Sequence, residues 1–441
     1  MNMLRNSVVA LAAILLVGNS HCEAQSSDAL INKLIEKGIL TSQEAKELRE
    51  QADQDFKEAY SARSGMPEWV SALKFNGDLR LRYENIHVDD PTFPDRNRFR
   101  YRLRFGATAS LTDNFEIGLR LISGETARGN FSTLNPISGN ATLGDNASKK
   151  LIGIDLAYVQ WEPIESSDWN LTLSGGKIRN PFTSSEMLFD NDYTPEGLSQ
   201  QLSYQLNKEH TLQLNLGQFI LDELAETSND PYLLGAQVRW DAEWSSRWNS
   251  SLGLAAFSIQ GQESLTSANV PDQNSGNTRR ADGSLVREFH PVYGDVSVTH
   301  SLESFPLYNG SFPIKFLGDV IYNPGSPTEN MAYSIGATFG RANKRRTWEL
   351  SYRWLYQEAD SWYEELVNSD LAAFYQVAPV GGRRGLGSGT NIRGHVIRGA
   401  YAPMDYLTLR ITYSLMEAII ETPATSNSES GRLQVDAMWR F

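Results

Sequence analysis

The chain has 441 residues, a formal net charge of −13 and an apolar fraction of 40%. Its low mean hydropathy excludes a bundle of transmembrane helices, because each such helix needs about 20 consecutive apolar residues. The 10 Trp, 18 Tyr and 18 Phe argue against a disordered chain, and the acidic balance argues against a nucleic-acid partner. The single cysteine, Cys22, excludes a disulfide framework and a Cys-based zinc site.

Residues 1–24 have the pattern of a secretory signal peptide. Arg5 precedes an apolar run over residues 8–17, and Cys22-Glu23-Ala24 places small residues at the −3 and −1 positions of a cleavage site. The apolar run is too short to serve as a membrane-spanning anchor. We therefore expect an exported protein whose mature chain contains no cysteine.

Residues 25–71 are predicted to form a periplasmic helical prefix. A first helix ends at Gly38, and Thr41 with Glu44 has the spacing of a capping box at the start of a second. Apolar residues then recur at three- and four-residue steps: Ala45, Leu48, Ala52, Phe56 and Ala59. This stripe can pack within a helical hairpin or join protomers in a short coiled coil, and both interpretations stay open.

From residue 72 to residue 441 the apolar period changes to two. Apolar and charged residues alternate over 78–84 and 98–105, and apolar and polar residues alternate over 115–121 and 407–415. Because successive side chains of a strand point to opposite faces, each segment has one apolar and one polar face. Sixteen such segments start near residues 74, 96, 114, 151, 169, 198, 211, 233, 248, 291, 312, 331, 346, 392, 406 and 431.

Four of these segments, near 198, 248, 291 and 392, are weakly patterned. The segment near 248 changes phase between Leu254 and Phe257, and we expect a β-bulge there.

Short turns and long loops alternate between the segments. Short connections fall at 112–114, 207–210, 245–246, 342–344 and 403–405, and long ones at 123–150, 179–197, 262–290, 359–391 and 417–430. This alternation is typical of an outer-membrane barrel. We therefore predict an all-β fold, a transmembrane antiparallel β-barrel of about 16 strands. The glycine-rich stretch 381–389 is predicted to be a flexible external loop.

The direction of the two faces follows from the arginines. Many Arg lie on the polar face. If this face points inward, the interior must contain water, because a closed dry core could not solvate the guanidinium groups. Leu, Phe, Tyr and Trp on the other face suit a hydrocarbon belt, so the apolar face should point to lipid and the polar face to water.

The last strand carries an assembly signal. Alternating apolar residues lead through Trp439 to the terminal Phe441. This ending looks like the signature of bacterial outer-membrane proteins that the barrel-assembly machinery reads, which indicates an outer-membrane location.

Two stretches carry a family resemblance. One is Glu36–Ala45, and the other is Gly176–Phe182 continued by Asp190–Gly197. The chain resembles the porins of Gram-negative bacteria that have a short helical prefix before the barrel. The resemblance implies a barrel of about sixteen strands, a water-filled channel for small hydrophilic solutes and ions, and a homotrimer in outer-membrane lipid.

In such a channel the inward arginines form a ladder on one wall. The residues that we expect there are Arg80, Arg82, Arg98, Arg100, Arg102, Arg104, Arg120, Arg410, Arg432 and Arg440. In porins of the general diffusion type the third long loop narrows the pore. Here that loop, 179–197, carries Glu186, Asp190, Asp192 and Glu196, which predicts a charged constriction between loop carboxylates and wall arginines.

A specific channel, an enzyme and an energy-coupled receptor are the alternatives to a general diffusion channel. A substrate-specific channel for small anionic solutes fits the same barrel. An outer-membrane enzyme would need a rim nucleophile and base, for which His300 with Ser297 or Ser301 are the candidates. An energy-coupled receptor needs a folded plug and about 22 strands, for which the chain is too short. The histidines lack metal-ligand spacing, so no cofactor and no metal are predicted.

Overall fold

The computed structural model describes residues 66–127, 134–225, 228–271, 274–421 and 427–441. The chain divides into two compact units, residues 1–72 and 73–441. The predicted signal peptide lies outside the described residues, as does the helical prefix apart from residues 66–71. None of the helices in the described residues is long and apolar enough to cross a membrane.

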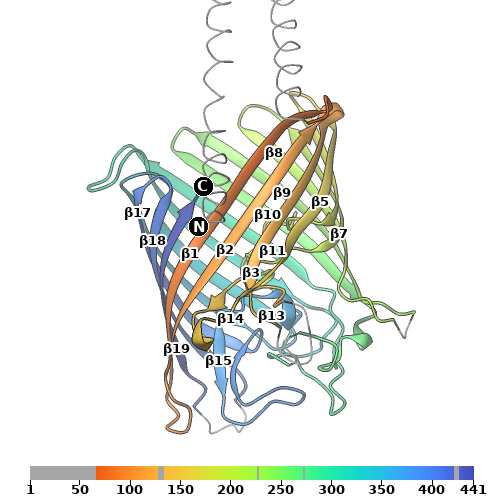
Figure 1. Cartoon of the computed structure of the whole chain (residues 1–441), viewed down its shortest axis with the longest axis vertical. Helices are drawn as coiled ribbons and strands as arrows, with labels where there is room; N and C mark the ends of the chain where they lie inside the picture. The colour runs from red at the N-terminus through yellow and green to blue at the C-terminus, as the bar shows by residue number, and fades with distance from the viewer. Residues whose placement is uncertain (1–65, 128–133, 226–227, 272–273, 422–426) are drawn as a thin grey trace, which may run out of the picture. The chain divides into compact units, whose positions relative to one another are not determined.

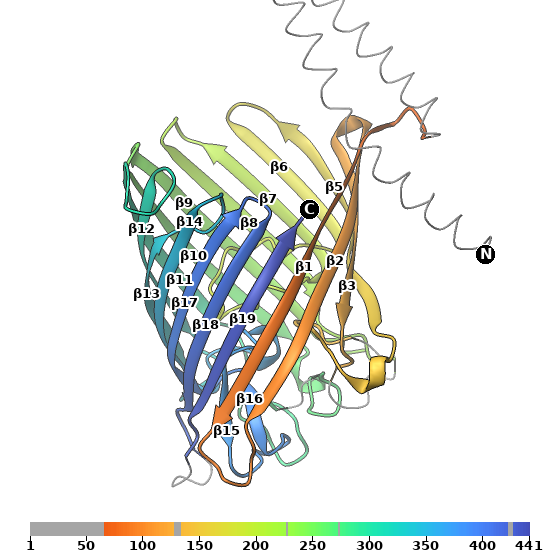
Figure 2. The same cartoon turned by 60° about the vertical axis from the view of Figure 1, so that its left-hand side comes forward.

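Sixteen long strands of the described residues form the second unit's wall (Figure 1). They are β1 (Val70–Val88), β2 (Arg96–Leu111), β3 (Phe115–Gly124), β5 (Leu151–Glu165), β6 (Trp169–Lys177), β7 (Glu196–Gln205), β8 (His210–Ile220), β9 (Tyr232–Ser245), β10 (Trp248–Gln260), β11 (Val292–Leu302), β12 (Phe312–Tyr322), β13 (Met331–Gly340), β14 (Thr347–Gln357), β17 (Ile392–Met404), β18 (Leu407–Ala418) and β19 (Ser430–Arg440). Each strand pairs antiparallel with its neighbours, and β1 also pairs with β19, so the sheet closes on itself. Figure 2 shows β19 and β1 side by side at this seam.

Shorter elements lie between the long strands. β4 (Ala141–Thr142) pairs with β2, and β15 (Ala372–Tyr375) pairs with β16 (Gly385–Ser388) as a separate two-stranded sheet. Four 3₁₀ turns complete the described elements: η1 (Thr112–Asn114), η2 (Asp145–Ala147), η3 (Gln262–Ser264) and η4 (Glu364–Leu366).

All sixteen predicted strands are confirmed, including the four with weak patterns. The largest difference in a starting residue is at β1, which begins at Val70 rather than near 74. The bulge predicted between Leu254 and Phe257 is wrong, because β10 pairs in unbroken register with β9 there and shifts only at Trp248/Asn249. The apolar pattern changes phase because Phe257 and Ile259 are buried inside the barrel, where inward-folded loops cover them.

The two faces are oriented as predicted. Leu81, Phe99 and Ile411 are exposed on the outward face, whereas Arg82 and Arg102 are buried on the inward face. Aromatic pairs stand near the ends of the wall, such as Trp169 stacked on Tyr204. This is the arrangement that lipid outside and water inside require.

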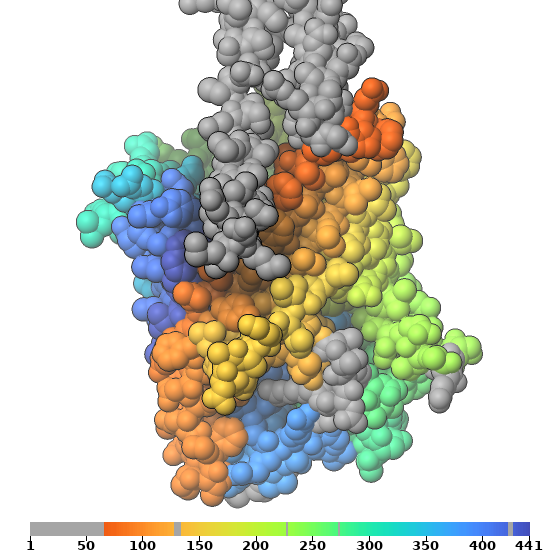
Figure 3. Space-filling view, in the orientation of Figure 1, coloured from red at the N-terminus to blue at the C-terminus, as the bar shows by residue number. Residues whose placement is uncertain are grey.

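Eight connections, most of them long, gather at one end of the barrel, and seven, most of them short turns, lie at the other. We name the long loops L1 (89–95), L2 (125–150), L3 (178–195), L4 (221–231), L5 (261–291), L6 (323–330), L7 (358–391) and L8 (419–429). In the space-filling view L7, in blue, lies among the other long loops at the lower end (Figure 3). The stretch 381–389 of L7 is not a free external loop, because it contains β16 paired with β15.

The seam leaves no room for a side chain at Gly77. Gly77 N donates to Phe441 O at 2.8 Å, and Phe441 N donates back to Gly77 O at 3.1 Å. A Cβ at Gly77 would lie 2.4 Å from Arg104 O and 2.6 Å from a ring carbon of Phe441. The terminal residue is thus hydrogen-bonded to the first strand at the point where the barrel closes.

We predict that Gly77→Val weakens closure of the barrel, because the added side chain must displace either the Arg104 backbone or the Phe441 ring. The temperature at which the folded barrel converts to the unfolded form on gel electrophoresis should fall. Gly294→Val is the matched control, since the nearest heavy atom to a Cβ there, Leu254 Cδ2, lies at an ordinary contact distance of 3.5 Å. Equal thermal stability of the two variants would contradict the seam's dependence on Gly77.

Candidate functional site

L3 folds into the barrel and packs against the wall formed by β8 to β10. Its side chains Met187, Leu188 and Phe189 are buried in one cluster with Phe219 of β8 and Phe257 of β10. At its start, Thr183 N donates to Gln237 Oε1 at 3.0 Å, and Gln237 Nε2 donates to Thr183 O at 2.6 Å. Apolar packing and these paired hydrogen bonds therefore hold L3 inside the barrel.

L7 folds inward as well and stacks on L3. Trp362 is 0% exposed, and its indole Nε1 donates to Leu188 O at 2.7 Å. Asp190 N donates to Leu366 O at 2.7 Å, so the two loops also share a backbone hydrogen bond. The sequence predicted a long loop over 359–391 without a position for it, and the structure places many of its apolar residues in the interior.

A buried ion pair ties L5 to L7. Arg279 of L5 and Glu364 of L7 are both fully buried and lie 2.7 Å apart, from Nη2 to Oε1. The other carboxylate oxygen of Glu364 accepts from the backbone N–H groups of Ser275 and Asn277 at 2.8 and 2.6 Å. Burial raises the pKa of Glu364, although Arg279 opposes this shift. L3, L5 and L7 are thus linked to one another on one side of the lumen.

The predicted arginine ladder lies on the opposite side, where each side chain has a specific environment. Arg82 of β1 donates Nε to Asp436 Oδ1 of β19 at 2.7 Å and Nη2 to Oδ2 at 2.9 Å. Arg102 of β2 contacts Asp78 of β1 at 2.9 Å. The other pairs with β1 are Arg98 with Glu84, Arg100 with Glu84 at 3.9 Å, and Arg104 with Asp78 at 2.6 Å.

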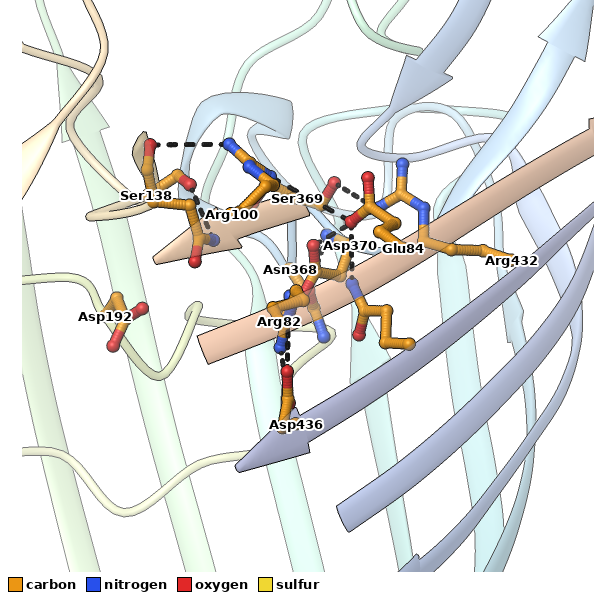
Figure 4. Close-up of polar contacts among 12 residues, drawn as sticks. Arg82, Glu84, Arg100, Ser138, Asp192, Asn368, Ser369, Asp370, Arg432 and Asp436 are labelled. Carbon is orange, nitrogen blue, oxygen red and sulfur yellow. Dashed lines mark hydrogen bonds and ion pairs between the residues drawn. The ribbon is translucent and has the colours of Figure 1, made fainter. Parts of the chain in front are cut away.

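Asp370 of L7 reaches this wall and was not predicted. Its carboxylate lies 3.0 Å from Arg82 Nη1 and 3.1 Å from Arg432 Nη1, and Figure 4 shows Asp370 beside these side chains of β1 and β19. Burial would raise the pKa of Asp370, but Arg82, Arg432 and Arg80 outweigh it and hold the pKa below its usual range. A negative charge is therefore fixed on the arginine wall.

Three of the predicted L3 carboxylates lie in the lumen. Asp192 accepts two hydrogen bonds from Arg102 Nη1, at 2.8 and 2.9 Å. Glu186 contacts Arg398 Nη2 of β17 at 2.6 and 2.8 Å, and this pairing holds the pKa of Glu186 low despite burial. Asp190 accepts from Ser369 N at 3.1 Å instead, and burial with the nearby Asp192 charge raises the pKa of Asp190 well above its usual value.

Two residues predicted at the pore constriction, Glu196 and Arg120, do not line the lumen cavity. Glu196 begins β7, and its carboxylate is 63% exposed beside Lys177 of β6 at 2.9 Å. It therefore belongs to the strand wall and not to the loop inside the pore. Arg120 of β3 pairs with Asp155 of β5 at 2.5 Å and does not line the lumen cavity described below. In β19, Trp439 lies opposite Leu79 of β1, at the seam where the barrel closes.

A lumen cavity of 550 Å³ lies between the arginine wall and the inward loops. It is bordered by Arg80, Arg82, Arg398 and Arg410 on the strands, and by loop residues that include Asp192 and Asp370. A second space of 140 Å³ lies beside Arg98 and Arg100. Four residues line both spaces: Ser138, Asn140, Ser369 and Asp370. These residues of L2 and L7 lie where the two spaces adjoin.

Three arginines that line the cavity, Arg80, Arg410 and Arg440, form no ion pair with a described carboxylate. Arg80 Nη2 donates to Asn140 Oδ1 at 2.6 Å, and its Nε has no hydrogen-bond partner. Arg410 Nε is likewise buried without a partner. Arg80 and Arg410 are half-buried, whereas Arg440 is exposed to solvent, so the charges of Arg80 and Arg410 are the least compensated of the three.

Several site residues were missed at the level of sequence. Asp78, Glu84 and Asp436 occupy inward positions of the same alternating strands as the arginines, so the pattern itself could have identified them. Asp370 follows the apolar residues Trp362 and Leu366 in a loop too apolar for a solvated rim. That composition was the signal that L7 enters the barrel.

The candidate enzyme pair is not assembled. His300 stacks on Trp248 at the outward face, with ring centroids 4.2 Å apart, whereas Ser297 lines an inward cavity. Ser301 follows Ser297 by four residues on β11, so it points to the same face, because side-chain direction along a strand repeats every two residues. Within the described residues no group of three His, Cys, Asp or Glu side chains could hold a metal ion.

Comparisons with known proteins support this geometry. Residues 90–289 match the family model described as "Putative porin". The structure of Pseudomonas putida OprB at high pH shares 8% identity with a TM-score of 0.52, covering 87% of this chain and 97% of that one. A loop L8 deletion mutant of Vibrio cholerae OmpT shares 10% identity with a TM-score of 0.46, covering 84% and 99%.

A mutant of Rhodopseudomonas blastica porin shares 10% identity with a TM-score of 0.42, covering 84% of this chain and 100% of that one. No curated protein matches the chain. The likeness to OprB shows the fold, and the family match connects that fold with a porin channel in the outer membrane.

We predict that Trp362→Ala loosens L3, because the indole that fills the space between L3 and L7 and binds Leu188 O is removed. Large buried aromatic residues cost about 3–5 kcal/mol when truncated to alanine. The variant should unfold at lower denaturant concentration and show a noisier open-channel current. Trp161→Ala, at an outward-facing residue that is 40% exposed, is the control and should leave the current unchanged.

Proposed function

We propose that this protein, whose residues 90–289 match the family model described as "Putative porin", forms a water-filled channel for passive diffusion of small hydrophilic solutes and ions. The observation that carries the proposal is the 550 Å³ lumen cavity, whose walls are largely polar and charged. A closed barrel with lipid-facing apolar residues and a hydrated, charged interior is the architecture of a membrane channel.

The charges on the cavity walls supply the proposed selectivity. Arg80, Arg398 and Arg410 face it from the strands, while Asp192 and Asp370 face it from the loops. Such opposed charges set up a field across the passage, which orients polar solutes and their hydration water. An apolar solute cannot replace the interactions of that ordered water, so it is disfavoured.

The residues of L7 change where we expect the constriction to lie. Ser138 and Asn140 of L2 and Ser369 and Asp370 of L7 line both spaces of the lumen. We therefore place the proposed constriction between these residues and the ladder, with L3 supporting L7 from the side. The arginines Arg100 and Arg432 border the smaller space.

A second candidate is a specific channel for small anionic solutes. It is favoured by Arg80 and Arg410, which line the cavity without a carboxylate partner among the described residues. An anionic solute would gain two charge-assisted contacts there. This candidate uses the same barrel and differs only in how tightly a solute is held during passage.

We further infer a homotrimer. An outward groove of 710 Å³ crosses β17, β18, β19, β1 and β2, and its lining is mostly apolar, with the small residues Gly399 and Ala437 at its floor. Such a surface suits contact with a second copy or with lipid. In biogenesis, the terminal strand with Trp439 and Phe441 would be read by the barrel-assembly machinery, and residues 25–71 would remain in the periplasm.

Single-channel recording in a planar bilayer tests the proposed function. Under a salt gradient, stepwise current increases in multiples of three would support an open trimeric porin, and the sign of the reversal potential would report its ion preference. A current that ceases on addition of a small anion would favour the specific channel. A correctly folded barrel that conducts neither ions nor solutes would reject both.

We predict that Arg80→Gln with Arg410→Gln shifts the reversal potential toward cations, because the two least compensated positive charges of the cavity are removed. Arg120→Gln with Arg353→Gln is the charge-matched control, since these arginines are paired with Asp155 and Asp319 and neither lines the cavity. Its effect should be clearly smaller. Identical shifts in the two variants would contradict the importance of direct pairing.

We predict the opposite shift for Asp370→Asn. The depressed pKa of Asp370 keeps this carboxylate ionised at neutral pH, so the substitution removes a full negative charge and leaves Arg432 without this partner. The reversal potential should move toward anions in a salt gradient at pH 7. An unchanged reversal potential would place Asp370 outside the conducting path.

A further inference from the structure

A cleft outside the lumen has a chemistry that the channel does not use. It lies at the short-turn end, between the turn 303–311 and the turn 341–346, and has a volume of 830 Å³. Its lining includes Leu307, Tyr308, Arg345, Arg346, Trp348 and Tyr401. Trp348 and Tyr401 stand opposite each other on β14 and β17, so the cleft begins on the wall itself.

Specific contacts between the two turns hold the cleft in shape. Tyr308 OH donates to Arg341 O at 3.1 Å and accepts from Arg341 N at 3.2 Å. Asn309 N donates to Arg346 O at 3.2 Å. The Tyr308 ring meets Trp348 edge to face, with centroids 6.1 Å apart. The two turns are therefore joined across the outward face and do not depend on a ligand for their position.

The outer rim of the cleft is basic. Four cationic residues, Arg341, Lys344, Arg345 and Arg346, occur within six positions, and all four are exposed. The side chains of Arg345 and Arg346 form no ion pair or hydrogen bond with the described residues. The carboxylate of Asp405 contacts the backbone of this turn, where Arg345 N donates to Asp405 Oδ1 at 2.8 Å. The two guanidinium groups can thus accept an external anion.

The inner part of the cleft is apolar and aromatic. Leu307 is 93% exposed and has a φ of 60°, so the turn projects an apolar side chain outward. On the same outward faces of β14 and β17, Leu350 and Ile397 are also exposed. A ligand in the cleft would therefore meet cations at one end and a hydrocarbon-like surface at the other.

We propose that this cleft binds an anionic phospholipid of the inner leaflet of the outer membrane. The short turns are the periplasmic end of such a barrel, which places the cleft at the level of the phospholipid head groups. Lys and Arg near a membrane surface attract anionic lipids, and Trp and Tyr prefer the same interface. The phosphate would lie against Arg345 and Arg346, and the acyl chains along Trp348 and Tyr401.

Lipid titration of the purified full chain in detergent tests the proposal. Native mass spectrometry would compare retention of phosphatidylglycerol with that of phosphatidylcholine. Arg345→Gln with Arg346→Gln should weaken phosphatidylglycerol binding about 30-fold, as the loss of two head-group contacts implies. Lys149→Gln with Lys150→Gln, two basic residues of L2 at the other end, is the charge-matched control and should bind as the unaltered protein does.

A second variant tests the apolar half. Leu307→Ser should weaken retention of both lipids without removing the preference for phosphatidylglycerol. Heat-dependent gel migration would confirm that each variant still folds as a barrel.

Other outcomes would overturn the proposal. Unchanged phosphatidylglycerol binding by the Arg345/Arg346 variant would do so, as would equal retention of the two lipids by the unaltered protein. Displacement by inorganic phosphate alone would show that the acyl chains contribute nothing. Loss of oligomers with unchanged lipid binding would assign the cleft to a second copy of the chain.

Discussion

The hydrogen bonds between β1 and β19 are the interaction on which the rest of the structure depends. A lipid bilayer offers no partner for exposed backbone N–H and C=O groups, so a sheet can cross it only when every strand has two neighbours. Eleven register pairs from Asp78–Arg440 to Val88–Ser430 provide this closure. Because register fixes which side chains point inward, closure also decides that Arg82 and Asp436 meet in the lumen while Leu81 and Val435 face lipid.

Closure brings many arginines together, and the surrounding structure compensates most of their charge. Neighbouring strands supply carboxylates at Asp78, Glu84 and Asp436, and the inward loops supply Asp192 and Asp370. Removing a carboxylate from such a set would leave a poorly compensated cation, which is costly in a partly desolvated site. The ladder therefore depends on loops that come from distant parts of the chain, and its net field depends on the few arginines that remain without a direct partner.

Packing of the loops determines where a solute can pass. Phe182, Phe189, Phe257 and Trp362 form aromatic contacts between L3, L7 and the β10 wall. This cluster occupies the part of the lumen that adjoins β8 to β14, so the open cavity is displaced toward the arginine wall. The apolar residues of L3 and L7 thus support the polar path indirectly, since they hold Asp192 and Asp370 against the strands. The cleft at the short-turn end is separate from this path and concerns the outer surface alone.

The sequence by itself determined the wall of the barrel. Alternation of apolar and polar residues is a local property of each strand, because side-chain direction has a period of two and does not depend on partners. For this reason the strand starts, the outward direction of Leu81 and Phe99, and the inward direction of Arg82 and Arg102 could all be predicted. The phase change at Phe257 could not be interpreted in the same way, because its cause is the contact of Phe257 with Phe182 of L3 and Trp362 of L7.

The tertiary structure alone decided how the loops fill the lumen. L3 was predicted to enter, but the position of Asp370 in L7 depends on its contacts with Arg82, 288 positions away, and with Arg432, 62 positions away. Glu196 shows the converse, since its charge suggested a pore residue while strand pairing placed it beside Lys177. A loop has no periodicity from which its direction can be calculated, so its position follows only from the packing and ion pairs that it finds once the barrel has closed.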